Sequence, residues 1–194
     1  MLTASALTVQ LAALAALGAI GVLPLAFFRR GEHNVRWCLT ALPFVASGAA
    51  LVLGAAGVLE PWPAAAAVQT ALAVVTAAGS LAGVALIALT VGAHRIPLSL
   101  WHQDADDPVE IVDWGPYRAI RHPFYAAFLV ILTSAALAFP HALTVLAAIC
   151  GALVLNHTAA REERRLLASR FKDRYAAYLA RTGRFLPARL GRNA

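Results

Sequence analysis

Three long, mainly apolar stretches most strongly limit what this chain can fold into. They cover residues 6–28, 37–59 and 65–92. Each reaches the roughly 20 residues that an α-helix needs to cross the hydrocarbon core of a membrane. A segment inside that core must satisfy its backbone hydrogen bonds internally. Each stretch therefore predicts a transmembrane helix.

Two shorter apolar stretches follow, at residues 123–139 and 141–156, and only Pro140 separates them. They predict a tight helical hairpin. A helix rises about 1.5 Å per residue, so such helices are about 25 Å long, against a hydrocarbon core of about 30 Å. The pair either barely spans the membrane or crosses a thinned one. The chain is thus predicted to be an all-α integral membrane protein with about five transmembrane helices.

Composition supports this class. Of 194 residues, 60% are hydrophobic and 13% are charged, whereas soluble domains average about 45–50% and about 25%. The length suits a single domain over residues 1–194. Although the net charge is +6, the basic residues lie beside apolar stretches, which argues against nucleic-acid binding. The two cysteines are far apart in apolar stretches, so we expect neither a disulfide framework nor a metal site.

The charges indicate an orientation. Arginines follow the first and third apolar stretches and the fifth, whereas Glu60 is the charged residue that follows the second. The positive-inside rule then places the N-terminus outside and the C-terminus in the cytoplasm. The preference for arginine over lysine and the many alanines are typical of a GC-rich bacterial genome. We therefore expect the protein in a bacterial cell membrane.

A polar segment, GPYRAIRHPFY at residues 115–125, leads into the fourth apolar stretch. Polar side chains at a membrane boundary cost free energy and often mark a functional site. The alternative is an interfacial anchor, in which arginine contacts lipid phosphate and tyrosine lies among the headgroups.

Residues 158–182 contain few helix breakers and predict a cytosolic amphipathic helix. Its apolar face is formed by Leu167, Phe171, Tyr175 and Tyr178. Glu163 lies one turn before this face, so it should either pair with Arg121 or bind a polar group of a ligand. Glu162 is expected to point about 100° away, toward Asp173 and solvent. The alternative is an interfacial helix in which Glu163 only caps the helix start.

The segment GPYRAIRHPFY, an apolar hairpin and then REERRLLASRFKDRYAAYLARTGRFLP (residues 161–187) resemble the isoprenylcysteine carboxyl methyltransferase family. The wider group includes membrane phospholipid N-methyltransferases and small thiol S-methyltransferases. The resemblance covers residues 94–188. It implies a cofactor, S-adenosylmethionine, bound at the cytosolic face under the C-terminal helix. Residues 1–93 are then a three-helix scaffold, and residues 94–188 form the cofactor-binding and catalytic half.

The resemblance also implies site residues. Those expected to bind the cofactor are Val109, Ile111, Val112, Tyr117, His122, Pro123, Phe124, Tyr125 and Glu163. Aromatic side chains would cover the adenine and the sulfonium, the latter through cation–π attraction. Arg121 and Arg161 are the catalytic candidates, because they are placed to meet an anionic group of the substrate.

Three positions depart from the family pattern: Val109 replaces a histidine, Ala159 an arginine and Arg164 a glutamate. The methyl acceptor is therefore expected only to be a small or lipophilic molecule. A carboxylate or thiol is favoured, because no dedicated base is evident except His122 or Glu163. Membrane lipids are the other expected partners, and stripes of small residues would allow an oligomer.

Two other functions remain open. An NADPH-dependent membrane reductase of the sterol-reductase type carries a similar Arg-His-Pro element, but its tail has a cysteine and a Lys-Tyr-Gly step where this chain has Phe171-Lys172-Asp173. A non-catalytic membrane scaffold or small transporter would show polar groups at mid-membrane depth. The first three apolar stretches contain almost none.

Overall fold

The computed structural model describes residues 13, 16, 18, 35–93 and 110–188. Most of the expected first membrane helix and the expected cofactor-binding residue Val109 lie outside the described residues. The described part is all-helical, as predicted, and contains five α-helices and no β-strand. A short 3-10 helix, η1 (Gly115–Arg118), precedes the fourth apolar stretch.

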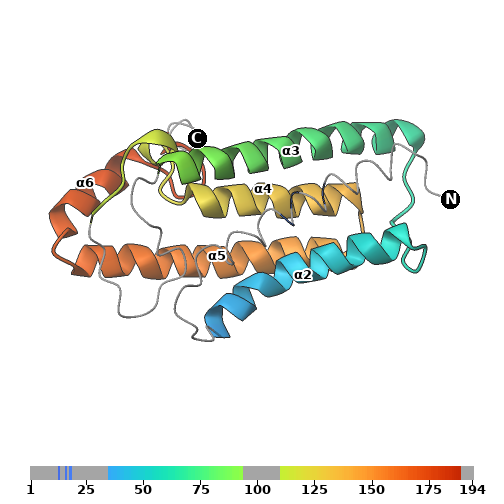
Figure 1. The fold of residues 1–194 in the computed structure, drawn as a ribbon, viewed down its shortest axis with the longest axis horizontal. Helices are drawn as coiled ribbons and strands as arrows, with labels where there is room; N and C mark the ends of the chain where they lie inside the picture. The colour runs from blue at the N-terminus through green and yellow to red at the C-terminus, as the bar shows by residue number, and fades with distance from the viewer. Residues whose placement is uncertain (1–12, 14–15, 17, 19–34, 94–109, 189–194) are drawn as a thin grey trace.

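The helices run back and forth along one long axis (Figure 1). Their bounds are α2 Val35–Ala55, α3 Ala66–Ala93, α4 Pro123–Ala138, α5 Ala142–Ala168 and α6 Lys172–Arg181. Helix α3 packs along α4, and α2 packs along α5, while α4 also contacts α5. Helix α6 folds back at the end of the bundle where α3 ends and α4 begins.

Two of the described helices, α3 and α5, are long and apolar enough to cross a membrane. Residues 41–55 of α2 and the whole of α4 are apolar but shorter. Large apolar side chains lie on the outside of the bundle; on α3, Val74, Leu81 and Leu89 are 64%, 72% and 63% exposed. Of the five membrane helices expected, the described part thus contains two of spanning length.

The expected turn between the fourth and fifth apolar stretches is present, and its residues begin α5. The N-terminal cap of α5 is His141, whose Nδ1 accepts a hydrogen bond from the Leu143 amide at 3.1 Å. Thr144 Oγ1 accepts from the His141 amide at 3.3 Å and lies 2.7 Å from the Phe139 carbonyl oxygen. The Trp62 amide donates to the Pro140 carbonyl at 2.7 Å, which ties this turn to the α2–α3 loop.

The expected helix boundary at residue 157 is wrong. Helix α5 continues unbroken to Ala168, so its 27 residues extend about 40 Å. The chain breaks instead at Ser169, whose hydroxyl contacts the Leu166 carbonyl at 2.8 Å and accepts from the Phe171 amide at 3.2 Å. Serine competes for backbone hydrogen bonds in this way, which favours helix ends. The predicted helix 158–182 is therefore the end of α5 followed by α6.

Close helix packing explains a glycine pair in α3. A Cβ atom at Gly83 would lie 2.5 Å from Ile131 Cγ1 of α4, and one at Gly79 would meet Ser134. At Gly92, farther along α3, a Cβ would meet nothing within 4 Å. The pair Gly79 and Gly83 thus forms the surface on which α3 packs against α4.

Gly83→Leu should destabilise the protein, because an added side chain must force α3 and α4 apart. Overpacking of this kind costs about 1–3 kcal/mol. Gly92→Leu is the matched control, since it brings the same gain in helix propensity at an open position. Thermal unfolding in detergent should show a lower midpoint for Gly83→Leu than for Gly92→Leu. Equal midpoints would contradict the observed α3–α4 contact.

Candidate functional site

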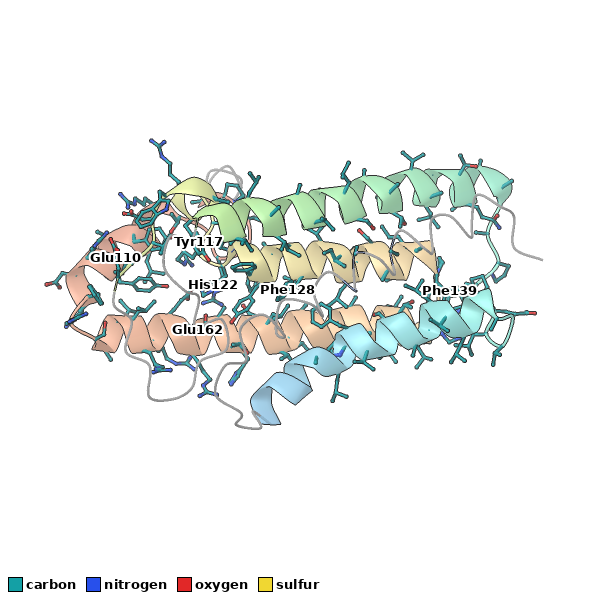
Figure 2. All side chains as sticks on the ribbon, in the orientation of Figure 1. Glu110, Tyr117, His122, Phe128, Phe139 and Glu162 are labelled. Carbon is teal, nitrogen blue, oxygen red and sulfur yellow. The ribbon has the colours of Figure 1, made fainter. Side chains whose placement is uncertain are left out.

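Charged and aromatic side chains gather at the end of the bundle beside α6. Figure 2 shows His122 and Glu162 close together between α4 and α5, with Tyr117 near the same end. The segments that meet there are the residues just before α4, the last third of α5, and the tail after α6. Residues 115–125 thus contact the start of the predicted helix 158–182, where the Arg121–Glu163 pair was one of the expected contacts.

The segment before α4 is held to the end of α3. The indole Nε1 of Trp114 donates to the Ala93 carbonyl at 2.7 Å. Gly115 has φ +58°, and a Cβ there would lie 2.8 Å from the Cβ of Ala93, so glycine suits both the backbone and the contact. Pro123 begins α4 directly after His122, and the His122 side chain makes no capping hydrogen bond. Its ring is therefore available to contact α5.

Glu163 is the centre of the ion pairs. It is 6% exposed, and Arg121 Nε lies 2.9 Å from its Oε1. Arg184 donates to the same carboxylate from Nε at 3.1 Å and from Nη2 at 2.5 Å. Arg121 Nη1 also donates to the Thr182 carbonyl. A buried carboxylate needs such partners, because desolvation of an unpaired charge is costly.

Glu162 does not point to solvent, contrary to the expectation. The Tyr125 hydroxyl donates to its Oε1 at 2.7 Å, and His122 Nδ1 lies 3.4 Å from its Oε2, with the Glu162 side chain 15% exposed. Neighbouring residues on a helix point about 100° apart. Both glutamates still reach His122. A glutamate side chain is long enough to bend toward α4 from either of these two neighbouring positions.

His122 lies between the two carboxylates and is 9% exposed. Its Nε2 is 3.3 Å from Glu163 Oε1 but is buried without a well-formed hydrogen bond to any residue that the structure describes. The ring stacks on Tyr125 at a centroid distance of 5.4 Å and an interplanar angle of 3°. Burial lowers the pKa of His122, but the interactions with Glu162 and Glu163 outweigh it and raise the pKa above its ordinary 6.5.

A tail strap, residues 182–185, closes one side of the site. The Arg121 amide donates to the Gly183 carbonyl at 2.8 Å, the Gly183 amide to Ala119 at 3.1 Å, and the His122 amide to Arg184 at 3.1 Å. A Cβ at Gly183 would collide with the Leu186 carbonyl oxygen, so the strap requires glycine here. The strap brings Arg184 to Glu163 and the Phe185 ring to 6.3 Å from the His122 ring.

The remaining predicted residues lie around this cluster rather than in it. Ile111 is buried against Tyr175 and Tyr178 of α6. The Tyr117 carbonyl accepts from the Tyr178 hydroxyl at 2.6 Å, and burial raises the pKa of the Tyr117 hydroxyl above its ordinary value. Phe124 belongs to the apolar core of the bundle.

Three further predicted residues have no polar role in the cluster. Val112 is half-buried, and Pro123 is buried at the first position of α4. Arg161 is half-buried on α5, and the salt-bridge partners of Glu163 within the described ranges are Arg121, His122 and Arg184 rather than Arg161. It lies two residues before Glu163, hence about 200° around the helix.

Sequence reasoning missed Glu162 and Arg184 as site residues. The helical periodicity placed Glu162 off the apolar face, and Arg184 follows the last helix. The one available signal was the short distance in sequence between Arg184 and the Phe185-Leu186-Pro187 ending that belongs to the resemblance.

Comparisons of the chain with protein families, with curated proteins and with solved structures give no significant match. Among the described residues, no group of three or more histidine, cysteine, aspartate or glutamate side chains is arranged to hold a metal ion. The cluster is therefore described by its own chemistry: two carboxylates, two guanidinium groups, an imidazole and aromatic rings, all at one end of an apolar bundle.

Protonation of His122 should stabilise the fold. Because the pKa in the folded protein is raised, this contribution is fully present below about pH 6.5 and is lost as the pH rises through the raised pKa. The difference in thermal midpoint between wild type and His122→Asn should therefore narrow as the pH rises above about 6.5. A difference in midpoint that stays constant or widens with rising pH would show that Glu162 and Glu163 do not stabilise a charged imidazole.

Proposed function

We propose that this protein is an integral membrane methyltransferase that moves a methyl group from S-adenosylmethionine to a small or lipophilic acceptor. The observation that carries the proposal is the cluster itself. Arg121, His122 and Tyr125 precede or begin α4, Glu163 lies about forty residues later on α5, and these four side chains lie together. The two sequence segments that resemble the methyltransferase family therefore meet at one place.

The side chains present suit this cofactor. Its amino-acid part is a zwitterion, for which Arg121 and Arg184 offer donors to a carboxylate, and Glu162 and Glu163 offer acceptors to an ammonium group. Aromatic rings lie against His122 on two sides, which suits a sulfonium or an adenine ring. The buried Nε2 of His122 is a polar atom without a well-formed hydrogen bond, as expected where a ligand group is still to bind.

The bound cofactor supplies a methyl group that is already activated by the adjacent positive sulfur. The protein must then orient the two reactants and exclude water, and such positioning can supply roughly 7–11 kcal/mol. Arg121 and Arg184 hold Glu163 from two sides, the tail strap fixes the backbone beside His122, and α6 covers the end of the bundle. These residues form a site whose geometry is set before a ligand binds.

The distribution of charge supports a membrane orientation with the site in the cytoplasm. Arginines surround the start of α4, α6 and the tail strap, at one end of the bundle, whereas Glu60 lies in the α2–α3 loop at the opposite end. We therefore propose five membrane helices, with most of the first outside the described residues, an external N-terminus and a cytoplasmic C-terminus, in a bacterial cell membrane. The apolar outside of α3 would face lipid, from which a lipophilic acceptor can enter.

Ligand-dependent melting tests this function. S-adenosylmethionine and its demethylated product should each raise the thermal midpoint of the detergent-solubilised protein, because a ligand at 100 times its dissociation constant stabilises by about 2.7 kcal/mol. NADPH should have no effect. A shift with NADPH alone would favour a reductase, and no shift with any of the three would favour a non-catalytic membrane protein.

Variants test which residues the ligand-induced shift in thermal midpoint requires. Glu163→Gln and His122→Ala should remove the shift, whereas the matched control Glu60→Gln, an exposed glutamate at the opposite end of the bundle, should keep it. Full responses from Glu163→Gln and His122→Ala would place the ligand elsewhere.

A further inference from the structure

Both oxygens of Glu163 are occupied in this structure. Nitrogens of three side chains surround its Oε1: Arg121 at 2.9 Å, Arg184 at 3.1 Å and His122 at 3.3 Å. Its Oε2 accepts from Arg184 Nη2 at 2.5 Å. A carboxylate offers only about four lone-pair sites in all. A ligand that carries a positive group to Glu163 must therefore displace one of these partners.

Arg184 is the partner whose departure disturbs the site least. Its side chain is 30% exposed, against 11% for Arg121 and 9% for His122. The His122 ring is stacked on Tyr125, so it is held on its face as well as at its nitrogens. The Arg184 carbonyl accepts from the His122 amide at 3.1 Å. The backbone of the tail strap can therefore stay in place while the Arg184 side chain rotates.

Arg121 keeps Glu163 paired during such a movement. Its Nε lies 2.9 Å from Glu163 Oε1, and its Nη1 donates to the carbonyl groups of Leu179 and Thr182. The guanidinium of Arg121 is thus fixed from two sides. This matters because a buried carboxylate without a partner is costly.

Asn156 gives the Arg184 side chain a second contact on α5. Its Oδ1 accepts from Arg184 Nη1 at 2.7 Å. Asn156 lies seven residues before Glu163, hence about two turns away on the same side of the helix. The guanidinium uses Nη1 for Asn156, and Nε together with Nη2 for Glu163. Two parallel donors of this kind suit a carboxylate, and the contact with Asn156 keeps them beside the site when Glu163 is released.

We infer that the Arg184–Glu163 ion pair opens to take the α-amino-acid end of the cofactor: the ligand ammonium replaces Arg184 at Glu163, and Arg184 turns its Nε and Nη2 to the ligand carboxylate. The inference rests on the proposed methyltransferase function and deepens it. It gives Arg184 a role distinct from that of Arg121, which stays on Glu163. An α-amino acid carries both charges on one carbon, so one ion pair is exchanged for two. The amino-acid end is a zwitterion and leaves the charges of the cluster balanced.

Three adenosine ligands separate the two contacts. S-adenosylhomocysteine has the ammonium and the carboxylate, its decarboxylated form keeps only the ammonium, and 5′-methylthioadenosine has neither. Dissociation constants are measured by isothermal titration calorimetry on the detergent-solubilised protein. Wild type should bind S-adenosylhomocysteine at least about tenfold more tightly than the decarboxylated form, because hydrogen bonds between charged groups are the strong ones.

Arg184→Gln should abolish this preference. It should also bind the decarboxylated form more tightly than wild type does, because the ligand ammonium no longer competes with Arg184 for Glu163. Its affinity for 5′-methylthioadenosine should stay unchanged. Arg184→Lys, which keeps the charge but lacks the planar fork, should retain part of the preference for the carboxylate.

Arg181→Gln is the matched control. It removes the same charge three residues earlier in the chain, where Arg181 donates to Asp113 at 2.7 Å and is exposed. This variant should keep the full preference of wild type. A similar loss in Arg181→Gln and Arg184→Gln would show that the positive charge of the tail acts at a distance, and would overturn the contact.

The inference and the proposed function fail differently. If wild type binds neither S-adenosylmethionine nor S-adenosylhomocysteine, the proposed function is wrong and the inference falls with it. If wild type binds both but Arg184→Gln weakens all three adenosine ligands equally, Arg184 acts only on the fold. A preference that persists in Arg184→Gln, or no gain in its affinity for the decarboxylated form, would overturn the exchange and leave the proposed function in place.

Discussion

The contact between Glu163 and two arginines is the interaction on which the site depends. Arg121 precedes α4, Glu163 is on α5, and Arg184 follows α6, so one carboxylate joins three parts of the chain. None of these charges is favourable in a buried place unless the others are present. The pairing therefore requires the start of α4 and the tail to be brought against α5 together, and the backbone hydrogen bonds of the tail strap then fix that arrangement.

The unbroken length of α5 has a second consequence. Its first part is apolar, while its last turns carry Glu162 and Glu163. A single rigid helix thus fixes the two carboxylates relative to the apolar bundle, without a hinge at residue 157. In a membrane, such a helix would hold the charged cluster at a constant height above the hydrocarbon core. Under the proposed function, that geometry would suit a reaction between a water-soluble cofactor and an acceptor from the lipid.

Much of the helical framework could be predicted, because long apolar stretches end at proline, glycine and charge. The stretch predicted at 65–92 is α3 at Ala66–Ala93, and the one at 123–139 is α4 at Pro123–Ala138. The break at Ser169 could not be predicted, because it depends on one hydroxyl bonding to backbone groups. Residues 158–182 are otherwise favourable for a continuous helix.

Residues of the candidate site that depend on a local sequence pattern were predicted. Those that depend on packing between distant segments were missed. His122, Tyr125 and Glu163 follow from the motif and from helical periodicity. Glu162 was assigned to solvent because periodicity alone ignores the reach of a glutamate and the presence of a tyrosine across the helix interface. Arg184 depends on pairing between the tail and residues 119–122, which are more than sixty residues away in the chain, and no local pattern contains that pairing.

The charges of the cluster connect ligand binding to proton transfer. Arg121 and Arg184 balance Glu162 and Glu163, two positive charges against two negative ones. The net charge of these four side chains and His122 together is therefore set by His122. It is zero when the imidazole is neutral and +1 when the imidazole is protonated. A cationic ligand is repelled by the protonated form, so its binding favours loss of the His122 proton. Under the proposed function, the arrival of a positively charged methyl donor would therefore favour the neutral form of His122.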